Sequence, residues 1–230
     1  MITPTALAVS GAATVWVHAR LALPSRTVRV LHGGQDAVYV DDGGVCLGIL
    51  SRVAVAVPCG VRTILDELPE VGDEAVIGDG RFCFPGLEIT VSRFVDASVG
   101  RVDAVPRISV SSDELPAPAL ALLAQGDPRA VGLLLGRGSG LTPVGDDVLC
   151  GWLAARHAIG APVEPVASEV RRLAADRTNV LSATLLECAT RGEVIPQLRE
   201  VMDNRSGLDP LLAVGHTSGV GLALGMSLAG

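Results

Sequence analysis

The stretch GRGSGLTPVGDDVLCGW, residues 136–152, marks the point where the character of this sequence changes. Three glycines alternate with other residues, and then Thr-Pro, a further glycine and two adjacent aspartates lead into an apolar run. Thr is favoured as a helix cap and Pro as the first helical residue, so the stretch predicts a glycine loop followed by a helix that Thr142 caps and Pro143 begins. Asp146 and Asp147 then fall in the first helical turn, where carboxylates are electrostatically favoured.

The residues around and after this loop have the pattern of helices. The segment from residue 111 is rich in Ala and Leu with Pro and Gly between short runs, which is typical of short helices. Asp209 followed by Pro210 predicts another helix start, and Thr217 or Ser218 is the expected cap of the last helix. We therefore expect a helical domain over residues 111–230 that carries the GLTPxGDD and GHTSG motifs.

The residues before the expected helical domain have the pattern of strands. TVRVLHGG, DAVYVDDGGVCLGIL and RVAVAVPCGV show β-branched alternation, broken by Gly-Gly and Asp-Asp-Gly-Gly turns. Gly78-Asp79-Gly80 is an expected hairpin turn. These features predict a β-rich domain over residues 1–110, either a small barrel or a sandwich. The expected fold class is therefore α+β, with a β-rich N-terminal part and an all-α C-terminal part.

Composition excludes several classes of function. Of the 230 residues 49% are apolar but only 3% are aromatic, so the core must be built from Val, Leu and Ala. The net charge is −7 and there is no basic run, which argues against nucleic-acid binding. The last apolar run, residues 217–230, is too short and too rich in glycine to cross a membrane, and the N-terminus lacks the basic region of a signal peptide. The five cysteines are widely spaced, as in a reduced cytoplasmic protein.

The glycine loop is suited to binding an anion. Gly136, Gly138 and Gly140 permit positive φ, which lets N–H groups converge, and the start of the following helix adds partial positive charge. We expect the loop, with the Thr142 hydroxyl, to hold a phosphate or a carboxylate. It is not a Walker A loop, because the Gly-Lys-Ser/Thr ending is absent.

Two uses of the adjacent carboxylates compete. Asp146 and Asp147 would bind Mg²⁺ together with phosphate oxygens and water, and Mg²⁺ is the one candidate cofactor. In the alternative, they complement the helix dipole and do nothing else.

Two further stretches contain candidate site residues. In AVGHTSGVGLALG, His216 lies on a turn before the hydroxyls of Thr217 and Ser218, and it is a candidate general acid or base. In DRTNVLSATLLECATRGE, Arg177 is a candidate for bidentate contact with an anion. The alternatives are a solvated histidine in a turn and an ordinary helix start capped by Asn179 or Ser182.

Three motifs in this order carry a family resemblance. Within residues 130–230 lie GxGxGLTPxGDDxLxG, RTxxLSATLL…ATRGE and LLAxGHTSGxxLxxGM. They resemble a domain family, formerly of unknown function, whose members occur with genes of allantoin degradation. That family includes a subunit of oxamate carbamoyltransferase. The N-terminal half is similar to the family only in general character.

The resemblance implies a component of a carbamoyltransferase of purine catabolism, acting on oxalurate and phosphate to give oxamate and carbamoyl phosphate. Such a subunit works with two other chains, one of them similar to an acyl-CoA-synthetase-like protein, so we expect a hetero-oligomer, with a homo-oligomer as the alternative. The motif positions that the resemblance carries over as site candidates are Gly138, Gly140, Thr142, Asp146, Asp147, His216, Thr217 and Ser218.

Carbamoyl transfer to phosphate needs a positioned anion and a stabilised oxyanion. In this interpretation the glycine loop holds phosphate, carbamoyl phosphate or a small ureido acid, and Arg177 holds a second anion. Asp147 and His216 are the candidate catalytic residues, with His216 polarising the carbamoyl oxygen. Two alternatives stay open: a scaffold subunit whose glycines serve packing, and an ATP-dependent enzyme with Mg²⁺ on the two aspartates.

Overall fold

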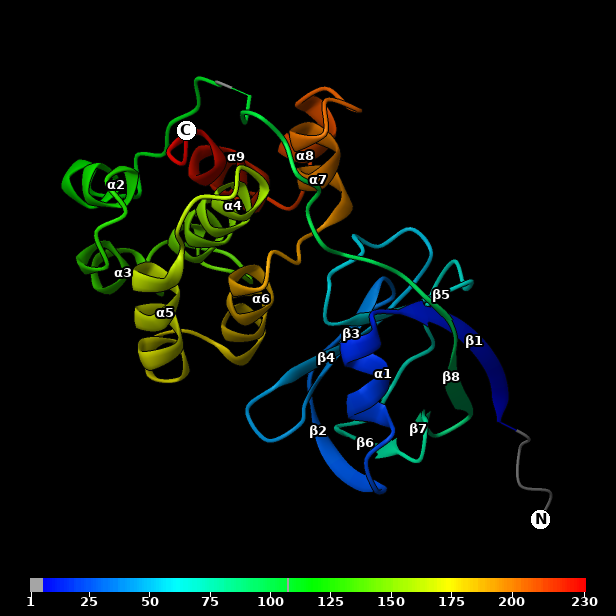
Figure 1. Ribbon diagram of the computed structural model, residues 1–230. Helices are drawn as coiled ribbons and strands as arrows, with labels where there is room; N and C mark the ends of the chain where they lie inside the picture. Colours follow the sequence, from blue (N-terminus) through cyan, green and yellow to red (C-terminus); the bar gives the residue numbers. More distant parts are fainter. Residues whose placement is uncertain (1–5, 107) are drawn as a thin grey trace, which may run out of the picture. The chain divides into compact units, whose positions relative to one another are not determined.

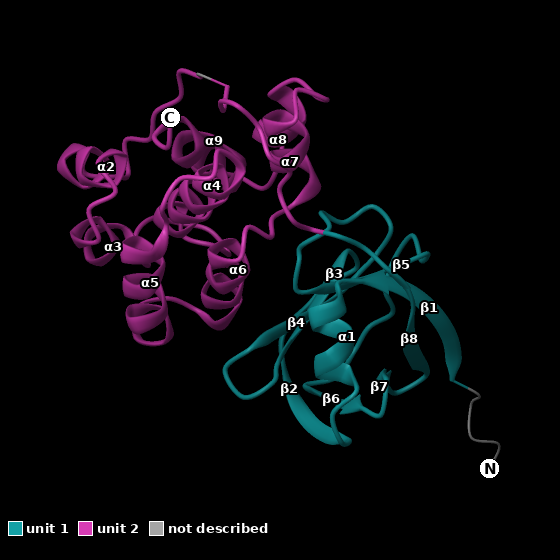
Figure 2. Cartoon of the chain, in the orientation of Figure 1, with its two compact units in different colours: residues 1–96 teal, residues 97–230 magenta. Residues whose placement is uncertain are grey.

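The computed structural model describes residues 6–106 and 108–230. The chain divides into two compact units, Met1–Asp96 and Ala97–Gly230, which Figure 2 shows in different colours. The first unit is built on strands and the second on helices, so the predicted α+β class is confirmed. Among the described residues no helix is both long and apolar enough to cross a membrane.

The first unit is a closed barrel, so of the two expected β architectures the barrel is the one that forms. Its strands are β1 (Leu7–Ala13), β2 (Arg26–Gly33), β3 (Ala37–Asp41), β4 (Cys46–Leu50), β5 (Gly60–Thr63), β6 (Glu74–Gly78), β7 (Arg81–Phe84) and β8 (Leu87–Phe94). Around the barrel they follow the order β1-β5-β4-β3-β2-β6-β7-β8, and the parallel pairing of β1 with β8 closes it. Closing a sheet in this way removes the exposed edges that an open sheet would have.

The predicted hairpin at residues 78–80 is confirmed. Gly78 pairs with Arg81 across β6 and β7, and the two turn residues between them, Asp79 and Gly80, have φ of 49° and 84°. Two positive φ values in a two-residue loop match the right-handed twist of the flanking strands, which is why Asp-Gly is favoured there.

One helix of the barrel unit departs from the strand pattern expected in this half. Helix α1 (Val15–Leu21) begins after Thr14, whose hydroxyl accepts a hydrogen bond from the N–H of Val17 at 3.3 Å. Figure 1 shows α1 against the barrel. Val17 and Leu21 of this helix are fully buried in the same core as the inward side chains of the strands. The β-branched residues of this segment suit a strand locally, but packing onto the barrel core decides its conformation.

The second unit consists of helices, as predicted. They are α2 (Ala117–Ala124), α3 (Arg129–Leu134), α4 (Val144–Ala158), α5 (Glu164–Arg177), α6 (Val180–Thr190), α7 (Pro196–Met202), α8 (Asp209–Leu212) and α9 (Ser218–Ser227). Nearly every residue of α4 is buried, which makes it the central helix of the unit. Asp209 and Asn179 begin or cap their helices where the sequence indicated.

Helices α4 and α9 lie side by side in close contact (Figure 1). A Cβ atom added at Gly151 would lie 2.1 Å from the carbonyl oxygen of Leu222, and one at Gly225 would lie 2.0 Å from that of Val148. Gly221 likewise faces Val144, the first residue of α4. Thr142, just before α4, contacts Ser218, the first residue of α9, so the two helices start at the same end.

Helix α6 runs in the same direction as α4. Near its start, the Thr178 hydroxyl donates to Asp146 in the first turn of α4. At its end, the carbonyl oxygen of Thr190 lies 2.8 Å from Nε2 of His157, in the last turn of α4. The N-termini of α4, α6 and α9 are therefore gathered at one end of the second unit.

Candidate functional site

The three sequence motifs meet where these helices begin. The Asn179 side chain, before α6, donates to the carbonyl oxygen of Leu141 at 3.0 Å. The Thr217 hydroxyl, before α9, donates to the carbonyl oxygen of Ser139 at 3.5 Å. The glycine loop, residues 136–142, thus lies against the starts of both neighbouring helices. Stretches that are far apart in the sequence are therefore brought together here.

Asp147 is a buried carboxyl beside two partly buried hydroxyls. This residue is only 6% exposed, and its Oδ2 accepts a hydrogen bond from the Thr142 hydroxyl at 3.1 Å. Oγ of Ser218 lies 2.9 Å from Oγ1 of Thr142. Burial raises the pKa of the Asp147 carboxyl to about 7, although the hydroxyls of Ser218 and Thr142 act in the opposite direction. This carboxyl therefore exchanges its proton near neutral pH.

Asp146, in α4, is hydrogen-bonded both to the glycine loop and to the segment just before α6. It is 1% exposed, its Oδ1 accepts from the N–H of Gly136 at 2.7 Å, and its Oδ2 accepts from the Thr178 hydroxyl. Burial raises the pKa of its carboxyl, against the effect of the Gly136 and Thr178 hydrogen bonds. The two adjacent aspartates are thus both buried, and they have different partners.

The glycine loop has the backbone that its sequence predicts. Gly136, Gly138 and Gly140 have φ of 72°, 101° and 109°. Two of the loop's N–H groups already have carboxylate partners within the protein: that of Gly136 donates to Asp146, and that of Ser139 donates to Oε2 of Glu114 at 2.9 Å. The loop thus binds carboxylates of its own chain.

Sequence reasoning missed Glu114. It lies 25 residues before its partner Ser139, whose hydroxyl also contacts Oε2 at 3.2 Å. Glu114 precedes α2 in an exposed segment without a glycine or histidine motif. No local signal indicates that it reaches the loop, because the contact depends on how α2 packs.

One cap was predicted at the wrong residue. Helix α4 begins at Val144 with Pro143 at the cap position, and this cap makes no side-chain hydrogen bond. Thr142, the predicted cap, has its hydroxyl turned to Asp147 instead. The physical reason is that the buried carboxylate needs a hydrogen-bond donor. The first N–H groups of the helix lie beside the loop and need the Thr142 hydroxyl less.

Two predicted site residues stand apart from the buried carboxylates. His216 is exposed, and its side chain makes no hydrogen bond within the part of the chain that the structure describes. Arg177, the last residue of α5, donates to the carbonyl oxygen of Gly132 at 3.3 Å rather than contacting Asp146 or Asp147. Its own carbonyl oxygen is close to Gly136, where an added Cβ atom would lie 2.1 Å from it.

Residues 6–106 and 108–230 contain no group of three or more His, Cys, Asp or Glu side chains that could hold a metal ion. Asp146 and Asp147 accept hydrogen bonds from neighbouring N–H and O–H groups instead. Binding of Mg²⁺ by this pair stays a prediction, and any bound cation would have to replace those donors.

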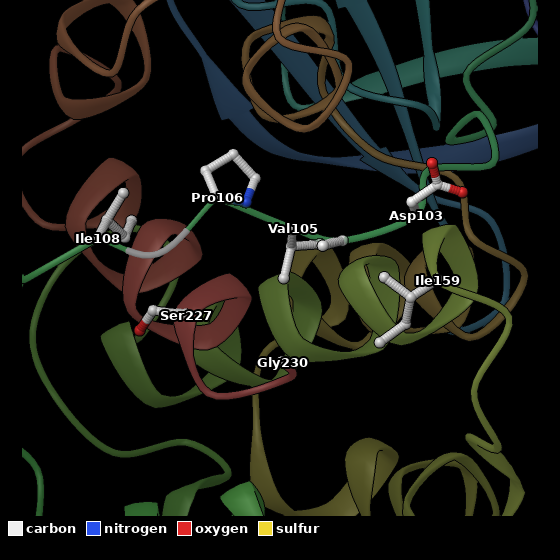
Figure 3. Close-up of a pocket in the computed structure, with 8 residues that line it drawn as sticks. Asp103, Val105, Pro106, Ile108, Ile159, Ser227 and Gly230 are labelled. Atoms are coloured by element: carbon white, nitrogen blue, oxygen red, sulfur yellow. The ribbon is translucent and has the colours of Figure 1, made fainter.

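One larger cavity of the helical unit lies away from the predicted site residues. It has a volume of about 470 Å³. Figure 3 shows residues that line it, among them Val105, Pro106, Ile159 and Ser227. Ile159 follows α4 and Ser227 ends α9, so this cavity lies at the opposite end of the parallel helices. Its lining residues include none of the predicted site residues. A smaller cavity, of about 330 Å³, adjoins the glycine loop at Gly136.

Comparison with known proteins supports the resemblance seen in the motifs. Residues 134–230 match the family described as oxamate carbamoyltransferase subunit AllH. The match spans α4 to α9, including all three motifs, and leaves out the barrel. No curated protein and no solved structure matches the chain.

Proposed function

We propose that the helical unit binds a small oxyanion where α4, α6 and α9 begin, as part of a carbamoyltransferase subunit of the oxamate carbamoyltransferase type. The oxyanion is phosphate, carbamoyl phosphate or a ureido acid. The family match over residues 134–230 supports the enzyme class. The observation that carries the binding site is the convergence of three helix N-termini on one glycine loop.

Electrostatics favours an anion at this place without any lysine. Each helix N-terminus has a partial positive charge of about half a unit and N–H groups that lack partners within the helix. Three such ends around one loop add their fields, and backbone N–H groups hold phosphate in many proteins. The buried carboxylates balance part of this field, and a protonated Asp147 would leave more of it for a substrate.

The proposed chemistry is attack of a phosphate oxygen on the carbamoyl carbon of oxalurate. The new C–O bond gives carbamoyl phosphate, and the C–N bond to the oxamate nitrogen breaks. The phosphate proton ends on that nitrogen, so atoms and charge balance. Asp147 moves this proton, because its pKa of about 7 lets it both accept and donate. His216, which is exposed two residues before the start of α9, polarises the carbamoyl oxygen.

In the test, the full chain is titrated with phosphate, carbamoyl phosphate, oxamate and Mg-ATP, and binding is measured by calorimetry and by thermal shift. Ser218→Ala removes a hydroxyl of the proposed site, and we expect it to weaken phosphate binding about tenfold. Ser227→Ala is the matched control, because Ser227 lies at the other end of α9 and its hydroxyl donates to the carbonyl oxygen of Leu224. We expect it to bind phosphate as the wild type does.

Equal affinity for phosphate in Ser218→Ala and Ser227→Ala would show that phosphate does not bind at these helix starts. A thermal shift with Mg-ATP but with none of the other ligands would instead favour the ATP-dependent interpretation.

A scaffold role is the second candidate, and the packing of the glycines favours it. Cβ atoms added at Gly145, Gly151, Gly219 and Gly225 would lie between 1.9 and 2.1 Å from backbone carbonyl oxygens of neighbouring segments. These motif glycines are needed for close packing whether or not a ligand binds. No shift with any anion, together with stable co-purification with the other carbamoyltransferase chains, would favour this role.

A further inference from the structure

A cavity of about 330 Å³ lies beside the first two residues of the glycine loop, Gly136 and Arg137. Its lining is chiefly polar and consists of Gly132, Leu133, Leu135, Gly136, Arg137 and Arg177. The two charged residues among these are both arginines. A positive cavity is unexpected in a chain of net charge −7, and this calls for an explanation.

Both guanidinium groups are held at the same end of α3. Nε of Arg137 donates to the carbonyl oxygen of Leu133 at 3.1 Å, and Nη2 of Arg177 donates to that of Gly132 at 3.3 Å. The two acceptors are consecutive residues, so the guanidiniums come to one place. Each guanidinium carries five N–H donors, and a single bond to a carbonyl leaves most of them available.

Neither arginine has an acidic partner within the described part of the chain, whereas other arginines of the helical unit do. Arg129 pairs with Asp127, and Arg171 and Arg172 pair with glutamates. The hydrogen bonds to carbonyl oxygens at the end of α3 use one N–H of each guanidinium and cap that helix. It does not explain why two unpaired cations line one polar cavity beside a candidate anion site.

We infer that Arg137 and Arg177 form a subsite for a small oxyanion, either a carboxylate or a phosphate, distinct from the helix starts. The inference rests on the proposed function, because carbamoyl transfer from oxalurate to phosphate brings two anions together. Gly136 lines this cavity and also donates its N–H to Asp146, so one residue joins the two subsites. Arginine matches both kinds of anion through its planar fork, and the sequence contains no lysine to act instead.

The experiment measures the dissociation constants of inorganic phosphate and of oxamate for the full chain by calorimetry at low ionic strength. We expect Arg137→Gln and Arg177→Gln each to weaken the binding of one of the two anions about tenfold to a hundredfold. The anion that is weakened identifies the chemistry of the subsite. Arg177→Lys retains the charge without the fork, and we expect an intermediate loss.

Arg172→Gln is the matched control, because it removes the same charge from an exposed position of α5 where Glu169 is the partner. It should change both affinities less than about twofold. Equal losses in Arg172→Gln, or unchanged affinities for both anions in the Arg137→Gln, Arg177→Gln double variant, would overturn the inference. Circular dichroism and the midpoint of thermal unfolding establish that each variant is folded at the temperature of the titration.

Ser218→Ala, measured in parallel, separates this inference from the proposed function. If anion affinity falls in Ser218→Ala but not in the arginine variants, the helix starts remain the binding site and the arginine subsite is refuted. Loss in the arginine variants alone would support the subsite and refute the site at the helix starts. No binding of either anion to the wild-type chain would refute both.

Discussion

At the scale of single residues, the chain's own carboxylates occupy donors of the glycine loop. Asp146 takes the N–H of Gly136 from inside the unit, where the aspartate is buried. Glu114 takes the N–H and hydroxyl of Ser139 from outside, where its side chain meets solvent. The first contact therefore holds the loop in place, whereas the second can be displaced by an anion from solution.

We expect Glu114→Gln to bind phosphate about three- to tenfold more tightly than the wild type. The change removes a negative charge at the loop, and a like charge about 4 Å away opposes an anion by about 1 kcal/mol even in water. Asp113→Asn is the control, since it neutralises the adjacent exposed residue. Calorimetric titration checks the prediction, and it fails if Glu114→Gln binds phosphate no more tightly than Asp113→Asn.

At the scale of elements, the parallel contact of α4 with α9 positions the site. Gly225 meets the carbonyl oxygen of Val148 and the backbone nitrogen of Trp152. Side chains can turn aside for a new methyl group, but these backbone atoms move only if the helices separate. Such separation would also part Ser218 from Thr142 at the start of the helices.

We therefore expect Gly225→Ala to destabilise the helical unit by about 3 kcal/mol or more. Gly132→Ala in α3 is the matched control, because nothing lies within 4 Å of the added Cβ. Alanine is favoured over glycine in a helix, so Gly132→Ala should leave stability unchanged or raise it by about 0.5–1 kcal/mol. Urea unfolding followed by circular dichroism measures both. Similar unfolding midpoints for the two variants would show that the α4–α9 contact tolerates a methyl group.

The same scale separates what the sequence could predict from what it could not. The Asp79-Gly80 hairpin and the Asn179 cap follow from signals within a few residues, and both occur as expected. Helix α1 was missed because its β-branched residues favour a strand locally and only the barrel core overrides them. Glu114 reaches Ser139, and Arg177 reaches Gly132, only through packing between segments, which no local pattern encodes.

At the scale of the whole molecule, the two units place their buried carboxylates in opposite environments. In the barrel unit, hydrogen bonds from Arg26 and Arg20 hold the pKa of Asp42 below its usual value. In the helical unit, burial without a cationic partner raises the pKa values of Asp146 and Asp147. Because a shifted pKa links protonation to folding, these carboxyls make the stabilities of the two units depend on pH with opposite sign.

The helical unit should lose stability as pH rises from about 4 to about 7. In this range the folded unit keeps the proton of Asp147 while the unfolded chain has released it, so the free energy of unfolding falls, by about 2–4 kcal/mol. The stabilising ion pairs of Asp42 are complete above its ordinary pKa and are lost only as pH falls below about 4. The stability of the barrel should therefore change little between about pH 5 and 7.

The chain has two tryptophans, Trp16 in the barrel unit and Trp152 in the helical unit. Urea unfolding followed by fluorescence in Trp16→Phe and Trp152→Phe backgrounds therefore reports on one unit at a time. Asp147→Asn should flatten the pH dependence that Trp152 reports, and an unchanged slope in that variant would show that Asp147 is not the group responsible.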